Sequence, residues 1–200
     1  MKYTILLFLF ISSLCIKGQD ELLLLNGKRY SGSSIDTTGL KVLFEMQKSE
    51  KKKKIKGFYK DEVFSVTLNE TESVIFSPDP FFPEDYSVED MRMVVYGKRD
   101  ARYLFKTKWV IPTGIVVGAA SAILMEGSVF SLLVPIVYTG LVQIPVVKIQ
   151  SKTIASPDFI GNDFYKEGYN RSARTKRTKH ALLSSAAGVI AGLLVVGLSQ

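Results

Sequence analysis

Three long apolar runs without a single charged residue dominate the second half of the chain, at residues 109–125, 129–147 and 181–198. A helix needs about 20 mostly apolar residues to cross the hydrocarbon core of a bilayer, with about 17 as the lower limit. The runs hold 17, 19 and 18 residues, so they predict three transmembrane helices. Because residues 126–128 are the whole connection between the first two runs, we expect residues 109–147 to form a tight helical hairpin.

Small residues recur at every fourth position in the first and third runs. Residues four apart share one face of a helix, and small side chains there let two backbones approach closely in lipid. The positions are Gly114, Gly118 and Ala122 in the first run and Ser184, Gly188 and Gly192 in the third. They predict that the helices pack through these faces, either within one chain or between chains.

The second run carries two prolines, Pro135 and Pro145, with Tyr138, Thr139 and Gln143 between them. Each proline removes a backbone donor and disturbs the preceding turn. We favour a kinked helix whose freed carbonyls are satisfied by neighbouring groups; the alternative is a broken helix that lines a polar path. The three runs contain no Asp, Glu, Lys, Arg or His, so the usual side chains of a proton relay or ion path are missing from them.

Residues 19–77 alternate between apolar and polar positions in short segments that are separated by turn signals. In residues 40–47, for example, every even-numbered position is apolar, as expected for one face of a strand. Asn26-Gly27 is a strong hairpin signal. About six strands are predicted, and tight hairpins with one apolar face must curl to bury it. This favours a small antiparallel β-barrel or sandwich of the SH3-like kind.

Six lysines fall close together in this part of the chain, at Lys48, Lys56 and residues 51–54. We interpret them as a solvated hairpin tip, because like charges repel and a loop tip holds them at little cost. The alternative is a binding patch for anionic lipid, an acidic glycan or a protein partner.

Three prolines within residues 78–83 end the sheet, so residues 78–86 are predicted to be a linker. Ser87 and Asp90 then form a capping-box pattern that opens a helix over residues 87–108, apolar on one side and basic on the other. Such a helix could lie along the membrane surface or pack on the β-domain. Residues 148–180 are predicted to be a basic interfacial segment, with a new helix starting near Pro157.

Aromatic and basic side chains are common anchors at the head-group level of a bilayer. The anchors expected here are Trp109, Tyr165, Tyr169, Arg171, Arg174, Lys176, Arg177 and Lys179. We expect these side chains to face membrane lipid, and the alternative is a specific lipid or partner site among them.

Residues 1–18 have the layout of a secretory signal, with Lys2 before an apolar run and Lys17-Gly18 after it. Cleavage near Gly18 would place the β-domain outside the cytoplasm and remove Cys15, the only cysteine of the chain. Acylation of Cys15 is the alternative, but Leu14 stands where a lipobox has a small residue. The basic flanks of the apolar runs favour the opposite orientation. We give precedence to the signal, because the first segment usually sets the orientation.

The formal net charge is +7, and a basic excess beside membrane helices more often faces anionic head groups than nucleic acid. No recognition motif for nucleic acid accompanies the charge. His180 stands alone before the third run, and the sequence shows no metal-ligand spacing, phosphate loop or nucleophile elbow. We therefore expect no enzyme activity, no cofactor, no metal and no nucleic-acid partner.

Residues 24–28 (LLNGK), 61–66 (DEVFSV) and 168–177 (GYNRSARTKR), followed by a glycine-rich C-terminal span, together resemble a group of uncharacterised bacterial envelope proteins. The resemblance implies a location in the bacterial cell envelope and no particular activity. The sequence thus predicts an α+β membrane protein that is a non-enzymatic interaction or assembly subunit. Its extracytoplasmic β-domain would bind an envelope protein, or the chain would associate with itself. The alternative is an oligomeric transport or pore component built from glycine-zipper helices.

Overall fold

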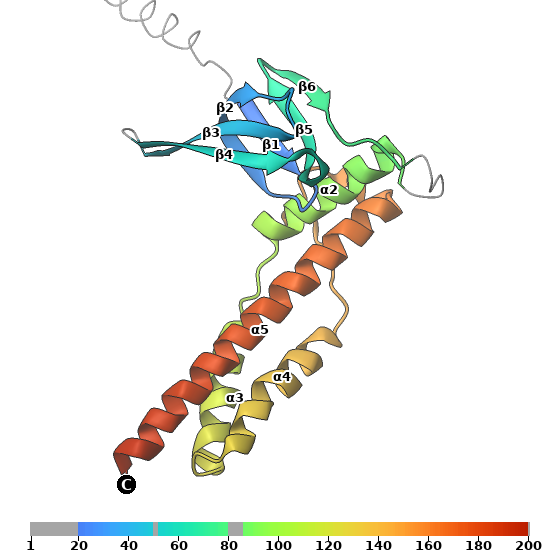
Figure 1. Ribbon diagram of the computed structural model, residues 1–200. Helices are drawn as coiled ribbons and strands as arrows, with labels where there is room; N and C mark the ends of the chain where they lie inside the picture. Colours follow the sequence, from blue (N-terminus) through green and yellow to red (C-terminus); the bar gives the residue numbers. More distant parts are fainter. Residues whose placement is uncertain (1–19, 50–51, 80–85, 200) are drawn as a thin grey trace, which may run out of the picture. The chain divides into compact units, whose positions relative to one another are not determined.

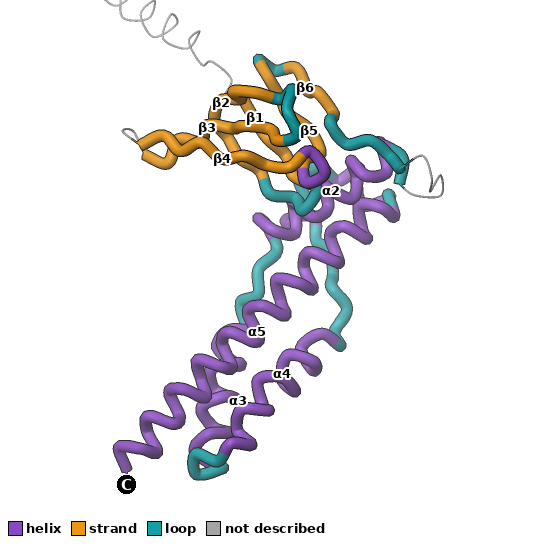
Figure 2. Tube along the Cα trace, viewed as in Figure 1, coloured by secondary structure: helices purple, strands orange, loops and turns teal. Residues whose placement is uncertain are grey.

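The computed structural model describes residues 20–49, 52–79 and 86–199, which form two compact units divided after Val88 (Figure 1). The described strands belong to the first unit and the α-helices after Val88 to the second, as Figure 2 shows by colour. The α+β class is therefore confirmed. The predicted signal peptide and most of the predicted linker fall outside the described residues.

The first unit is a six-stranded antiparallel sheet with the strand order β4-β3-β2-β1-β5-β6. Along the chain its strands are β1 Asp20–Leu24, β2 Arg29–Asp36, β3 Lys41–Ser49, β4 Lys52–Tyr59, β5 Val63–Leu68 and β6 Thr71–Val74, with a 3-10 turn at Lys60–Glu62. The predicted Asn26-Gly27 turn joins β1 to β2, and Gly27 adopts a φ of 76°, where glycine carries no steric penalty. β4 and β6 stand at the two ends of the strand order; closure into an SH3-like barrel stays a prediction.

One apolar core holds this sheet together. It consists of Leu22, Leu24, Val42, Phe44, Phe58, Val63 and Val66, all of which are buried. Successive residues of a strand point to opposite faces, so the alternation in β1 and β3 places these side chains on the same face. Tyr30 and Met46 cover the edge of the cluster.

The lysines are arranged differently from the prediction. Residues 52–54 and Lys56 lie within β4, paired along β3, instead of in a loop tip. Lys53 makes an ion pair with Glu45 at 3.1 Å, and the Lys56 ammonium lies 4.7 Å from the centre of the Phe58 ring. Cross-strand pairing and stacking therefore offset the repulsion that we expected to exclude these lysines from a strand.

The second unit is helical. It contains α2 Val88–Leu104, α3 Val110–Leu124, α4 Val134–Gln143 and α5 Asp163–Ser199, with 3-10 turns at Val129–Leu133, Ser151–Thr153 and Pro157–Gly161. The longest is α5, whose 37 residues extend over about 55 Å at the helical rise. It joins the basic interfacial segment and the third apolar run, which the sequence treats as separate elements, into one continuous rod (Figure 1).

Among the described helices, one, Asp163–Leu198, is long and apolar enough to cross a membrane. The 15 residues of α3 extend over about 22 Å, less than the roughly 30 Å of a hydrocarbon core. The first two predicted spans therefore remain predictions.

The helix predicted over residues 129–147 is shorter and changes type: one apolar helical segment covers Val129–Gln143. Val129–Leu133 is a 3-10 turn, Pro135 lies in the first turn of α4, and α4 ends at Gln143 before Pro145. The two prolines bound a short helix, since the first turn tolerates proline and the last carbonyls before Pro145 lose their donor.

Candidate functional site

The N-terminal part of α5 is held in place by a close crossing with α2. A Cβ atom on Gly97 would overlap the carbonyl oxygen of Tyr165, and one on Gly168 would overlap that of Val94. Only glycine lets two helix backbones approach this far. The helix predicted over residues 87–108 thus ends at Leu104 and packs on α5; its position along the membrane surface or on the β-domain stays a prediction.

A buried carboxylate closes this crossing. Asp100 is 3% exposed, and its Oδ2 accepts hydrogen bonds from the Tyr165 hydroxyl and the Ala155 N–H, both at 2.8 Å. Arg99 Nε donates to Oδ1 at 3.1 Å. Burial, followed by the hydrogen bond to Asp100, raises the pKa of the Tyr165 hydroxyl well above its ordinary range.

Two of the expected lipid anchors belong to this core instead. The side chains of Tyr165 and Tyr169 are fully buried among apolar residues that include Ala101 and Ile154. The Tyr169 hydroxyl donates to Thr153 Oγ1 at 2.8 Å. They tie α5 to the chain before it, and neither faces lipid. A helical wheel of α5 alone gives no sign of this, because the covering residues come from α2 and from loop segments.

Two further expected anchors, Lys176 and Arg177, hold the ends of neighbouring helices. Lys176 Nζ donates to the carbonyls of Arg102 and Phe105 at 2.7 Å, where α2 ends. Arg177 donates to the carbonyl of Pro145 at 2.7 Å and to that of Val142 at 3.3 Å, where α4 ends. These carbonyls have no partner within their own helix, so the two cations replace the missing donors.

The small-residue faces of α3 and α5 meet within the chain. A Cβ on Gly118 would overlap the carbonyl of Ser185, and one on Gly188 would overlap that of Ile115. Gly114 lies against Ser184 in the same way, and Gly192 lies against Ala119 and Ala122. The structure thus brings all six predicted packing positions into one interface.

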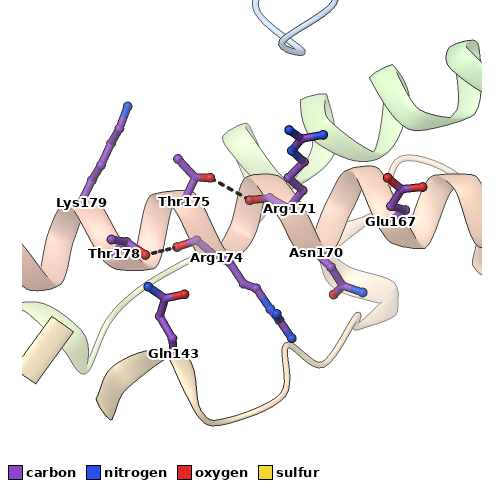
Figure 3. A pocket seen from close by; sticks show the side chains of 8 residues that line it. All are labelled: Gln143, Glu167, Asn170, Arg171, Arg174, Thr175, Thr178 and Lys179. Atoms are coloured by element: carbon purple, nitrogen blue, oxygen red, sulfur yellow. Dashed lines mark hydrogen bonds between the residues drawn. The ribbon is translucent and has the colours of Figure 1, made fainter. Parts of the chain in front are cut away.

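The remaining basic residues of α5 line an open hollow of about 640 Å³ (Figure 3). Its lining residues are Gln143, Glu167, Asn170, Arg171, Arg174, Thr175, Thr178 and Lys179. In Figure 3, Arg174 and Asn170 extend from α5 toward the side of Gln143, whereas Arg171 and Lys179 extend to the other side of the helix axis. Trp109, the last expected anchor, is largely exposed.

The hollow is rich in hydrogen-bond donors. The hydroxyls of Thr175 and Thr178 donate to the carbonyls of Arg171 and Arg174 at 2.9 Å, so they offer only lone pairs to a ligand. The guanidinium, ammonium and amide N–H groups remain as donors, which suits an anion. The sequence identified the three cations but missed Gln143 and Asn170, since Gln143 belongs to another helix.

Catalytic chemistry has no comparable basis in the described residues. No group of His, Cys, Asp or Glu side chains there could hold a metal ion. The ring of His180 contacts the Thr107 hydroxyl. Asp100, the buried carboxylate, is already bonded to three donors. Comparison of the chain with protein-family models, curated proteins and solved structures gave no match.

Proposed function

We propose that this chain is a non-enzymatic membrane protein of the bacterial cell envelope, in which a helical anchor carries a β-domain that acts as an interaction or assembly subunit. The observation that carries the proposal is the division of α5 into two halves. Residues 163–180 are polar and basic, whereas residues 181–198 are uncharged and apolar. A rod with this division suits a head-group region followed by hydrocarbon.

The apolar half is also poorly covered by protein. Leu183 is 68% exposed and Leu194 63% exposed, and Val116 of α3 and Ile136 of α4 are similarly open. Exposure of so large an apolar surface to water is unfavourable in free energy. Soluble proteins accordingly rarely expose contiguous apolar patches above a few hundred Å². Lipid removes that cost, which supports a membrane location for α3, α4 and the apolar half of α5.

Two features argue against the alternative of an oligomeric pore. The small-residue faces of α3 and α5 are occupied by each other, so they do not offer a surface for a second copy. The hydroxyl groups of Tyr138 and Thr139 on α4 are bonded to backbone carbonyls. Tyr138 donates to the Val110 carbonyl at 2.8 Å, and Thr139 donates to the Pro135 carbonyl at 2.6 Å. Because these hydroxyls are already bonded, they are poorly placed to line a path for an ion or a polar solute.

The β-domain offers a surface for a partner. Leu40, Ile55 and Tyr59 are exposed on β4 and on the turn before β3, beside the lysines of β4. Exposed apolar side chains rimmed by charge are typical of protein interaction surfaces. The partner that this surface fits is an envelope protein with an apolar patch and acidic neighbours.

Alkaline carbonate washing and site-specific photocrosslinking test the proposal together. We expect the chain to stay in the membrane pellet, and a photoreactive residue at Ile55 to capture a discrete heterologous protein. The same residue at Glu70, in the turn between β5 and β6, serves as the control. Release by carbonate would contradict the membrane anchor. A ladder of self-adducts from Val116, with none from Ile55, would favour the pore.

A further inference from the structure

The proposed function gives no role to the hollow on α5, whose lining carries several positive charges. Arg171, Arg174 and Lys179 form no ion pair within the part of the chain that the structure describes, and Glu167 is the only acidic residue of the lining. Lys98 of α2 lies close by: its burial and the charge of Arg171 lower its pKa, whereas the charge of Glu167 raises it. So many like charges on one surface repel each other, and a bound anion relieves that repulsion.

An amide side chain of another helix also lines the hollow. Gln143 of α4 lies on the same side of α5 as Arg174 in Figure 3, and its N–H groups can donate to an anion. Asn170 Oδ1 is buried in the protein, so it does not take part in binding.

The surroundings of the hollow indicate an amphiphile. The apolar run of α5 begins at Ala181, directly after Lys179 and His180. Leu182 lies one turn beyond Thr178 and is 45% exposed, and Ile144 follows Gln143 and is 74% exposed. A charged rim therefore passes into an apolar surface within one helical turn. A free phosphate would use only the rim, whereas a phospholipid would use both.

We propose that this hollow is a binding site for an anionic phospholipid. Arg174 receives the phosphodiester on the side of Gln143, Arg171 and Lys179 add positive charge to the lining, and the acyl chains lie along Leu182 and Ile144. The site rests on the proposed function, since the apolar half of α5 must lie in the bilayer for a lipid to reach the hollow.

The test uses the purified full chain in neutral detergent micelles, where the protein senses no charged bilayer surface. Phosphatidylglycerol, phosphatidylcholine and inorganic phosphate are added separately, and binding is measured by thermal shift and by native mass spectrometry. Phosphatidylglycerol should bind, whereas phosphatidylcholine and inorganic phosphate at equal concentration should not. Equal stabilisation by inorganic phosphate would overturn the lipid assignment.

The double variant Arg171→Gln/Arg174→Gln should weaken phosphatidylglycerol binding about 30-fold, as each interfacial cation contributes about fivefold. The matched control is Lys106→Gln/Lys108→Gln, which removes the same charge from two exposed positions of the same unit. It should change binding less than about twofold. Equal losses in both variants would show general charge attraction and overturn the site, as would unchanged binding in the first.

Two controls keep the result interpretable. Arg171→Lys/Arg174→Lys keeps the charge and should recover most of the binding, which a fold defect would not allow. Carbonate washing of the wild-type chain separates the two proposals. If the chain is released, the membrane anchor itself fails. If it is retained but phosphatidylglycerol and phosphatidylcholine bind alike, only the headgroup site fails.

Discussion

At the scale of single residues, the helical unit depends on a few polar groups that meet far from their positions in the sequence. Asp100 is bonded to Tyr165 and Ala155, which lie 65 and 55 positions along the chain from it. A buried charge without partners would cost several kcal/mol, so these donors are what makes the carboxylate tolerable there. The same bonds fix the rotation of α5 relative to α2.

The pKa of Tyr165 leads to a prediction on alkaline stability. Because folding raises this pKa above its ordinary value of 10.0, the folded state holds the proton more tightly than the unfolded chain does. The resulting stability is complete below pH 10 and is lost as the pH rises further. Tyr165→Phe should therefore lower the melting temperature at pH 8, where a bond to a buried carboxylate is worth about 1.5 to 3 kcal/mol. It should also flatten the fall in melting temperature between pH 9 and 11.

Thermal unfolding in neutral detergent at several pH values measures both effects. Tyr103→Phe is the control, because Tyr103 lies on α2 but is exposed. Lys98 and Tyr169, whose pKa values are also shifted, are present in every variant; Tyr169 interacts with Tyr165 electrostatically, so the comparison reports the two hydroxyls together. An equally steep alkaline loss in Tyr165→Phe and wild type would show that Tyr165 does not couple folding to pH.

At the scale of elements, the sequence predicts the sheet better than the helices. Alternation predicts the buried residues Val42 and Phe44 of β3 correctly, because a strand's period is set by its own backbone, whereas Leu40 lies before the strand and is exposed. The ends of α4 were missed because residues 129–147 are mostly apolar and uncharged, and hydropathy does not distinguish a 3-10 helix from an α-helix. The sequence predicts the hollow only in part. Its three cations lie on one helix, α5, whereas Gln143 lies on α4 and reaches the hollow only through the packing of the two helices.

The α3–α5 interface gives a prediction at this scale. Gly188→Leu places a side chain where the backbone of Ile115 lies, so the two helices must separate. Overpacking of this kind costs about 1 to 3 kcal/mol. Gly197→Leu makes the same chemical change on the same helix where nothing lies within contact distance.

Resistance of the detergent-solubilised chain to sodium dodecyl sulfate would report the difference. Gly188→Leu should unfold at a clearly lower dodecyl sulfate fraction than wild type, and Gly197→Leu should match wild type. Identical behaviour of the two variants would mean that close packing of α3 on α5 contributes nothing to stability.

At the scale of the whole molecule, the open question is orientation. Within the helical unit, Lys106 and Lys108 precede α3, and the basic half of α5 precedes its apolar half. The turn at residues 126–127, where both residues adopt positive φ, and the end of α5 follow the apolar segments. If the apolar segments span the membrane as proposed, the sheet, which precedes the basic end in the chain, would lie on the same side of the membrane as that end. The positive-inside rule places that side in the cytoplasm, whereas a cleaved signal places it outside.

Single cysteines at Ser34, Ser128 and Ser199, in a Cys15→Ser background, decide between the two orientations. We expect a membrane-impermeant thiol reagent to label Ser34→Cys in cells with a permeabilised outer membrane, and to label the other two only after lysis. The physical reason is that the signal sets the orientation of the chain before the basic flanks of the three apolar runs are synthesised. Labelling of Ser128→Cys and Ser199→Cys without Ser34→Cys would show that the basic flanks set the orientation, and the partner of the β-domain would then be cytoplasmic. Labelling of all three in intact cells would mean that α5 does not span the membrane at all.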